Sequence, residues 1–434
     1  MARQNIPTLP EFEDEIDETD TLKRSAFLLG LVMLMLCSSS ILLVLLIMSP
    51  RLIPYGKVAW CQPQCQGLDL VRVDVTNSWP KIELDSLDLR EAQLRRTVLS
   101  DVDMSNSDLT DANFYKAQLQ GSDLTNAILA GANLREADMD KAVLAGVDLR
   151  GADLTEVNLH QADMSYVILG GATIDGIVLQ ETKLQGADLS GLDLRGLDLT
   201  KTDLRDANLR DVRLSGTDLS KADLRGAELW GANLYASKID RRTRLDSKWK
   251  LVWEVINESS VGRDLTGQDL SYAKLTGANL RQAILYEANL QEVDLGGVDL
   301  RSSDLRFCNL TGSSLGQSNL SEANLHQANL RGVSLWRSQL IAADLSGADL
   351  STVRIGSGNS EHQTNLRGAN LYAANLANAN LQGTDLSNAT LISVNLSGAD
   401  LTDSNLDGAD LTQAIYDDRT IWPAGFIPKG AIKQ

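Results

Sequence analysis

Large apolar residues stand at every fifth position over most of this chain. Three uninterrupted runs cover residues 84–239, 265–355 and 366–411, and Tyr416 keeps the phase once more. Two positions before each large residue stands a small one, most often Ala, and the position between them is commonly Asp or Asn. A helix of 3.6 residues per turn would spread this period around its circumference, so the pattern excludes an amphipathic helix.

The spacing inside each unit predicts short extended edges joined by corners. The small and the large apolar residue are two positions apart, which places both on one side of an extended segment. The remaining residues can then turn the chain. Stacked coils of this kind would bury the large residues in columns and pair successive edges as short parallel strands about 4.8 Å apart. The sequence therefore predicts a solenoid in which each unit packs on its neighbours.

Several blocks of this pattern carry a family resemblance. The segments ADLTEVNLHQADMSY, ANLREADMD, ADLRGAELWGANLY and SNLSEANLHQANLRG resemble the pentapeptide-repeat family, whose unit is A-(D/N)-L-x-x. The resemblance covers about residues 68–416 and implies a right-handed, four-sided β-helix with four repeats per coil. The family's central residue falls on Leu84 and its successors, and its small inward residue falls on Ala112 and its equivalents. The flap and tail segments resemble cyanobacterial members, which implies a cyanobacterial source.

An uncharged apolar segment precedes the repeats at residues 26–48. About 20 apolar residues in a helix cross a bilayer core of about 30 Å, so this segment is interpreted as a single transmembrane helix. The predicted fold class is thus all-β, a right-handed quadrilateral β-helix preceded by one transmembrane α-helix. The expected location is a bacterial plasma membrane or a thylakoid membrane.

Charges beside that segment leave its orientation open. Lys23 and Arg24 lie before it, and Arg51 and Lys57 lie after it, so the positive-inside rule is almost balanced. The close Lys23–Arg24 pair favours a repeat domain on the non-cytoplasmic side.

Two interruptions divide the repeats. In the first, Trp249, Val252, Trp253 and Ile256 follow helical spacing, which predicts a short helical flap that either shields the solenoid or docks a partner. The second interruption is rich in Gly, Ser and Asn and predicts a surface loop. The expected organisation is as follows: 1–25 disordered acidic tail, 26–48 membrane helix, 49–83 linker and N-terminal cap, 84–239 β-helix, 240–264 helical flap, 265–355 β-helix, 356–365 loop, 366–416 β-helix end, 417–434 C-terminal cap.

Charge and reactive residues argue against several function classes. The net charge of −18 and the pI of about 4.6 disfavour direct nucleic-acid binding, which needs clustered Lys and Arg. The three histidines belong to no nucleophile or metal constellation, so no enzyme activity, metal or cofactor is predicted. Cys61 and Cys65 lie close enough in sequence to form a local disulfide, or they remain two thiols.

Surface residues at multiples of twenty positions suggest a partner-binding face. Arg95, Tyr115, Arg135 and Arg195 share this spacing, and Arg and Tyr are common at interfaces. The favoured function is a non-enzymatic, membrane-tethered scaffold that offers a rigid rod for protein–protein interaction, in cell-envelope or thylakoid organisation. The alternative is a DNA-mimicking regulator of a topoisomerase such as DNA gyrase, which the Asp-rich faces fit. The protein partner stays unidentified.

Overall fold

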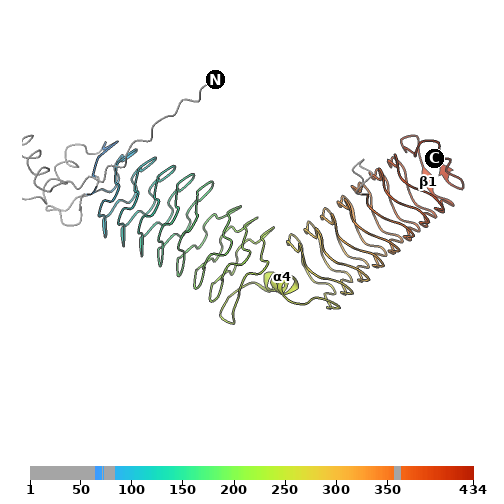
Figure 1. Ribbon diagram of the computed structural model, residues 1–434, viewed down its shortest axis with the longest axis horizontal. Helices are drawn as coiled ribbons and strands as arrows, with labels where there is room; N and C mark the ends of the chain where they lie inside the picture. Colours follow the sequence, from blue (N-terminus) through green and yellow to red (C-terminus); the bar gives the residue numbers. More distant parts are fainter. Residues whose placement is uncertain (1–63, 71, 73–83, 356–362) are drawn as a thin grey trace, which may run out of the picture.

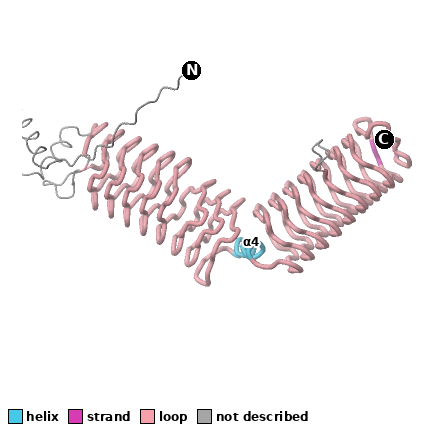
Figure 2. Tube along the Cα trace, in the orientation of Figure 1, coloured by secondary structure: helices cyan, strands magenta, loops and turns pink. Residues whose placement is uncertain are grey.

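The chain winds into a solenoid with two arms that meet at a bend (Figures 1 and 2). This computed structural model describes residues 64–70, 72, 84–355 and 363–434. The regular elements within these ranges are the helix α4 (Ser247–Asn257) and the strands β1 (Ile415–Tyr416) and β2 (Ile432–Lys433). Strands β1 and β2 pair in parallel at the C-terminal end of the second arm. The rest of the described chain consists of corners and isolated β-bridges.

Parallel bridges fix the register of the coils. Asp88 bridges Asp108, Asp108 bridges Ile128, and bridges of this twenty-residue spacing recur at most of the fifth positions that follow. Around Asp108, the Leu89 N–H donates to the Asp108 carbonyl at 2.7 Å, and the Asp108 N–H donates to the Leu87 carbonyl at 2.9 Å. Each coil therefore has four sides of five residues. The β-helix expected from the five-residue period is confirmed.

The interior holds one large and one small side chain from each side of a coil. Phe114 and the column leucines are almost completely buried, as are the alanines two positions before them. Several Thr and Ser residues that replace Ala donate their hydroxyl to a backbone carbonyl, as Thr97 does to Leu70 at 2.7 Å and Ser107 does to Leu84 at 2.6 Å. These bonds offset the cost of burying a hydroxyl group. A small residue is the usual one at this position, although Leu87, Ile177 and Leu192 also occupy it.

Each corner is a tight turn with one left-handed residue. The Ala112 N–H donates to the Leu109 carbonyl at 3.0 Å, and Asp111, between them, has a φ of 56°. A positive φ at the third residue is the feature of a type II turn, which favours Gly, Asn or Asp. Gly131 occupies the same corner one coil later, and a Cβ added there would collide with the Asp111 carboxylate. At this corner, Gly therefore leaves room for the Asp111 side chain of the coil before it.

Helix α4 lies at the bend between the two arms (Figure 1). Its buried side chains are Trp249, Val252, Val255 and Ile256, which fill the space that a further coil would occupy. Asp246 holds the N-cap position without capping the helix, because its carboxylate accepts the Gly226 N–H at 3.1 Å instead. The helix is therefore positioned by packing and by bonds to the solenoid more than by its own cap.

Polar bonds tie α4 to both arms. On the first arm, the Asn257 amide donates to the Leu234 carbonyl at 3.1 Å, and its oxygen accepts the Ala236 N–H at 2.6 Å. On the second arm, Lys248 donates to Asp269 at 3.0 Å and to Ser271 at 2.8 Å. The helix consequently acts as the bridge that joins the two arms.

The membrane part of the predicted fold class requires correction. In the described ranges no helix is long and apolar enough to cross a membrane, and α4 has only 11 residues. The segment 26–48, on which that prediction rested, lies outside the described residues. In the part of the chain that the structure describes, the fold is therefore a β-helix with one short helix. The predicted single-pass membrane location is corrected on the same finding.

Aromatic side chains lie at the C-terminal end of the second arm. The Trp422 ring contacts the rings of Tyr416 and Phe426, with centroids 5.4 Å and 5.5 Å away. The Leu401 N–H donates to the Ile421 carbonyl at 2.8 Å, so this segment continues the backbone pairing past the last regular coil. A solenoid end needs such covering because its strand edges would otherwise stay unpaired.

Truncation of Phe114 tests whether the columns hold the fold. Phe114→Ala should lower the free energy of unfolding by about 3–5 kcal/mol, because it opens a cavity in the stacked core. The matched control is Phe307→Ala, at a ring that is 41% exposed, which should cost less than about 1 kcal/mol. Urea unfolding followed by far-UV circular dichroism measures both. Equal losses would contradict the proposed packing.

Candidate partner-binding surfaces

Residues from the expected Arg and Tyr face lie on stacked coils. Arg95, Tyr115 and Arg135 follow one another on consecutive coils, as the bridges Gln93–Asn113 and Asn113–Asn133 require. Arg195 stands in the same row three coils further along. The structure therefore brings the first three together and leaves Arg195 apart.

Neighbours on the same surface neutralise part of this row. The Tyr115 hydroxyl donates to Glu136 at 3.2 Å, and the Lys116 ammonium lies 3.1 Å from the same carboxylate. Lys116 is the main reason that the pKa of Glu136 is lowered. The Arg135 guanidinium lies 4.0 Å from Glu136 and is half exposed. Arg135 is thus the member of this cluster with the most freedom to meet a partner.

Arg195 is held by a contact that recurs along the solenoid, here called the Asp–Arg clamp. Its guanidinium donates to both oxygens of Asp193, at 2.7 Å and 2.6 Å, across the column leucine between them. This contact lowers the pKa of Asp193 to about 2. The same clamp forms in these pairs: Arg90–Asp88, Arg150–Asp148, Arg205–Asp203, Arg225–Asp223, Arg301–Asp299 and Arg306–Asp304. Many carboxylates of this acidic chain therefore already have a cation beside them.

The two tryptophans expected to contact a partner lie against the solenoid. Trp249 is 6% exposed and packs into the core. Trp253 is half-buried, and its indole N–H donates to the Ser237 carbonyl at 3.0 Å. Both rings therefore anchor α4 to the solenoid. A partner could still contact the exposed part of the Trp253 ring.

An aromatic cluster at the bend escaped the sequence analysis. Trp230 of the first arm is 42% exposed and stacks on Tyr272 of the second, with ring centroids 4.7 Å apart. The Arg210 guanidinium lies 4.5 Å from the Trp230 ring centroid and pairs with Glu228 at 2.9 Å. We call Arg210, Trp230 and Tyr272 the junction cluster. The twenty-residue period places Arg210 and Trp230 in one row, but Tyr272 falls outside it, because α4 interrupts the coils between Trp230 and Tyr272.

Backbone contact between the arms holds the junction cluster in place. The Gly231 N–H donates to the Tyr272 carbonyl at 2.9 Å, in the manner of a bond between successive coils. A groove of about 320 Å³ opens beside it, and residues of both arms line it, among them Lys274 and Glu292. The cluster is therefore a preformed surface that exists only because the two arms meet.

A second aromatic set lies on the second arm. The Phe307 ring contacts Tyr286 and His326 edge-on, with centroid distances of 5.5 Å and 5.8 Å. The Arg306 guanidinium lies 5.3 Å from the Tyr286 ring centroid. His326 shares a hydrogen bond of 2.8 Å with Ser346. Twenty-residue spacing in the sequence was the signal that could have found this set.

The cysteines show no reactive site in the part of the chain that the structure describes. Cys65 is buried and disulfide-bonded, while Cys61 lies outside the described residues, so their pairing stays a prediction. Cys308 occupies an inward position where Ala is usual, and burial raises the pKa of its thiol. The described ranges also contain no group of three His, Cys, Asp or Glu residues placed to hold a metal ion.

The family comparison decides the classification. The family described as pentapeptide repeats (8 copies) matches residues 88–239, 264–355 and 362–415 in overlapping segments, well over half of the chain. The chain belongs to the pentapeptide repeat family. This confirms the resemblance drawn from the A-(D/N)-L-x-x units. A comparison with curated proteins finds no significant match.

Solved structures of other pentapeptide repeat proteins are similar to this chain. HetL from Nostoc sp. strain PCC 7120, involved in heterocyst differentiation regulation, is 25% identical and covers 76% of this chain and 92% of its own, with a TM-score of 0.15. QnrB1, a plasmid-mediated fluoroquinolone resistance protein, is 20% identical over 56% of this chain and 90% of its own, with a TM-score of 0.18. TM-scores this low support no functional inference.

Acid should weaken the clamps. A carboxylate with a lowered folded-state pKa stabilises the fold above its unfolded pKa of about 3.9 and loses that contribution as pH falls towards the folded value. Asp193 should therefore contribute at pH 5–8 and stop contributing between about pH 4 and 2. Asp193→Asn should lower the unfolding free energy at pH 7 by less than about 1 kcal/mol, because the pair is exposed, and flatten its pH dependence.

Urea unfolding between pH 2 and 8 measures this effect. The matched control is Asp407→Asn, which makes the same change in charge at an exposed residue without an ion pair among the described residues. The control should keep the pH dependence of the unchanged chain. An identical flattening in both variants would count against the clamp as its source.

Proposed function

We propose that this protein is a non-enzymatic scaffold that binds another protein through the junction cluster. The observation that carries the proposal is an exposed Trp stacked on a Tyr, with an Arg guanidinium over it, beside a groove. Trp, Tyr and Arg are the residue types most often found at the centre of binding interfaces. A stacked pair loses little side-chain freedom when a partner arrives, which favours affinity.

The rigid backbone supports the same proposal. Most coils are hydrogen-bonded to the next on all four sides, although Thr173 and Asp193, and Val178 and Asp198, form no bridge, and α4 is bonded to both arms. A partner would therefore meet surfaces that are already in their bound arrangement. Arg95, Tyr115, Arg135 and Arg195, with the reachable part of Trp253, remain proposed secondary contacts.

Nucleic-acid mimicry towards a topoisomerase receives less support. Such mimicry needs a continuous negative surface, whereas the Asp–Arg clamps place a guanidinium beside many of the acidic side chains. Cations also outnumber carboxylates in the region next to the bend. The charge of this chain is thus distributed in patches.

Photo-cross-linking in cells that naturally make the protein tests the proposal. Benzoylphenylalanine in place of Glu292, an exposed groove residue, should capture a discrete protein species. Adding Trp230→Ala should weaken capture at least about tenfold, because losing a central Trp typically costs about 2 kcal/mol or more of binding energy.

The matched control is Tyr166→Ala, which removes an aromatic ring that is 61% exposed and remote in sequence from the junction cluster. Capture from Glu292 should be unchanged by it. Equal effects of the two truncations, or the absence of any cross-linked protein, would contradict a binding surface at the junction cluster.

A further inference from the structure

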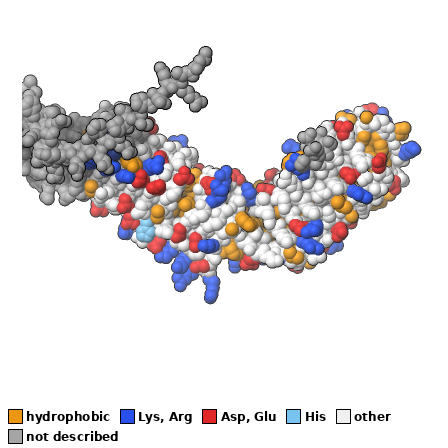
Figure 3. Space-filling view, viewed as in Figure 1, with side chains coloured by type: hydrophobic (Ala, Val, Ile, Leu, Met, Phe, Trp, Pro, Cys, Tyr) orange, Lys and Arg blue, Asp and Glu red, His pale blue; other side chains and the backbone are white. Residues whose placement is uncertain are grey.

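Positive charge accumulates in one short stretch of this acidic chain. Lys and Arg outnumber Asp and Glu between Lys201 and Lys250, although the whole chain carries −18. Figure 3 shows Lys and Arg side chains gathered on the first arm close to the bend. Six of these cations line one groove of about 570 Å³, here called the basic groove: Lys201, Arg205, Lys221, Arg225, Arg242 and Arg244.

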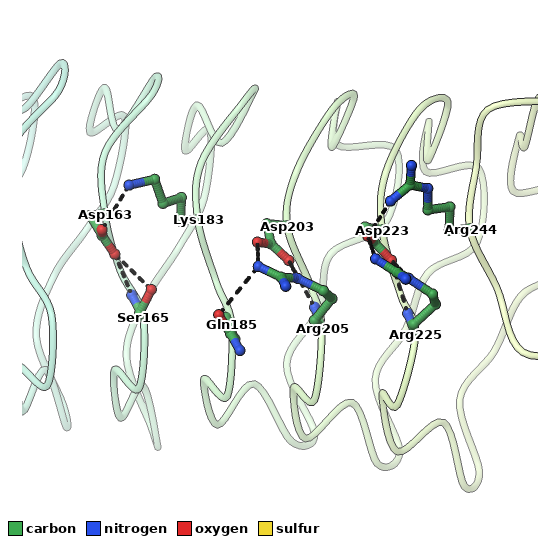
Figure 4. A network of polar contacts seen from close by, with 9 residues as sticks. All are labelled: Asp163, Ser165, Lys183, Gln185, Asp203, Arg205, Asp223, Arg225 and Arg244. Carbon is green, nitrogen blue, oxygen red and sulfur yellow. Dashed lines mark hydrogen bonds and ion pairs between the residues drawn. The ribbon is translucent and has the colours of Figure 1, made fainter.

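The coil register explains how these residues meet. Asp203 bridges Asp223, and Asp223 bridges Arg244, so three successive coils contribute to the groove. Side chains in one row are therefore separated by about 4.8 Å from coil to coil. Figure 4 shows the resulting arrangement, with Arg205 and Arg225 beside their aspartates and Arg244 next to Asp223.

One extra residue in the last coil determines the position of Arg244 in the basic groove. The step from Asp223 to Arg244 is 21 residues rather than the usual twenty. A turn absorbs the extra residue, because the Asp240 carboxylate accepts the N–H groups of both Arg242 and Thr243 at 2.9 Å. A cation thus stands where an acidic residue stands on the two coils before it.

The carboxylates in the basic groove are already neutralised. Asp203 is clamped by Arg205 at 2.8 Å and 2.6 Å, and Asp223 is clamped by Arg225 at the same two distances. Arg244 adds a further contact to Asp223 at 3.4 Å. A clamped guanidinium still has N–H donors that the carboxylate does not use.

Two cations of the basic groove have no acidic partner among the described residues. Lys221 and Arg242 form no ion pair with any residue that the structure describes. Lys201 pairs with Glu181, one coil earlier. Positive charge therefore exceeds negative charge in the basic groove, and the excess is available to an incoming anion.

We propose that the basic groove binds an acidic peptide segment of a partner protein. An extended peptide places alternate side chains on one side about 6.8 Å apart, so two or three carboxylates match the roughly 10 Å covered by three coils. A nucleic acid fits less well, because its charge continues beyond the groove onto an acidic surface that repels it. The proposal rests on the protein-binding function and names the chemistry of one contact.

Fluorescence anisotropy with a labelled octaglutamate peptide and the full chain tests the basic groove. The chain should bind the peptide saturably, and binding should weaken as salt rises from about 0.05 to 0.5 M. Lys221→Glu with Arg242→Glu should weaken binding at least tenfold. Neither side chain is paired, so this variant should keep the circular dichroism spectrum of the unchanged chain; Lys221→Gln with Arg242→Gln gives a milder second variant.

The matched control is Arg331→Glu with Arg367→Glu, which changes net charge equally at exposed residues of the second arm. Its binding should stay within about twofold of the unchanged chain. No saturable binding of octaglutamate, an equal loss in the control, or tighter binding of an eight-nucleotide oligothymidylate would each overturn the proposal. Cross-linking from Glu292 tests the junction cluster independently of the basic groove. A failure of peptide binding can therefore be distinguished from a failure of the proposed function.

Discussion

The packing of one large and one small side chain on each side of a coil governs the rest of this molecule. Columns such as the one through Phe114 hold mostly Leu beside mostly Ala, and these side chains are almost completely buried. The corners then require a left-handed residue, and the bridges require that each coil take twenty residues. With the backbone fixed in this way, sequence variation is confined to outward positions. The surface chemistry of the protein is therefore decided by which residues stand in each twenty-residue row.

Helix α4 shows what happens where that packing is interrupted. Trp249, Val252 and Ile256 supply the apolar volume of the missing coil, and Lys248 and Asn257 supply the polar bonds to each arm. The second arm resumes the five-residue period after the bend, but from Leu265, 26 positions after Ile239, so that the phase is shifted by one residue. Side chains that are far apart in the sequence meet as neighbours on successive coils across the break, as Trp230 and Tyr272 do. The interruption creates surfaces that a continuous solenoid cannot make.

The sequence predicted the repeating part of the fold and missed what depends on its breaks. The five-residue period predicted a solenoid of stacked edges, and the resemblance to the pentapeptide-repeat family implied four repeats per coil, from which the stacking of Arg95, Tyr115 and Arg135 followed. The clamp was also readable, because Asp-Leu-Arg places both charges on one outward face. The membrane-spanning helix was wrong as part of the fold class. Within the junction cluster, spacing alone could have paired Arg210 with Trp230, whereas the contact between Trp230 and Tyr272 depends on the interruption by α4.

Net charge is a poor guide to the surface of such a solenoid. Each Asp-Leu-Arg unit cancels its own charge within a few ångströms, so the field at the surface reflects the residues that are left unpaired. On the coils next to the bend these are cations, Lys221 and Arg242, and a 21-residue step places Arg244 beside Asp223 in addition. The surface of this acidic chain is therefore locally positive next to the bend. Because the same stretch leads into α4, the change of surface charge and the bend of the solenoid occur together. A partner that binds the positive surface would therefore lie close to the bend.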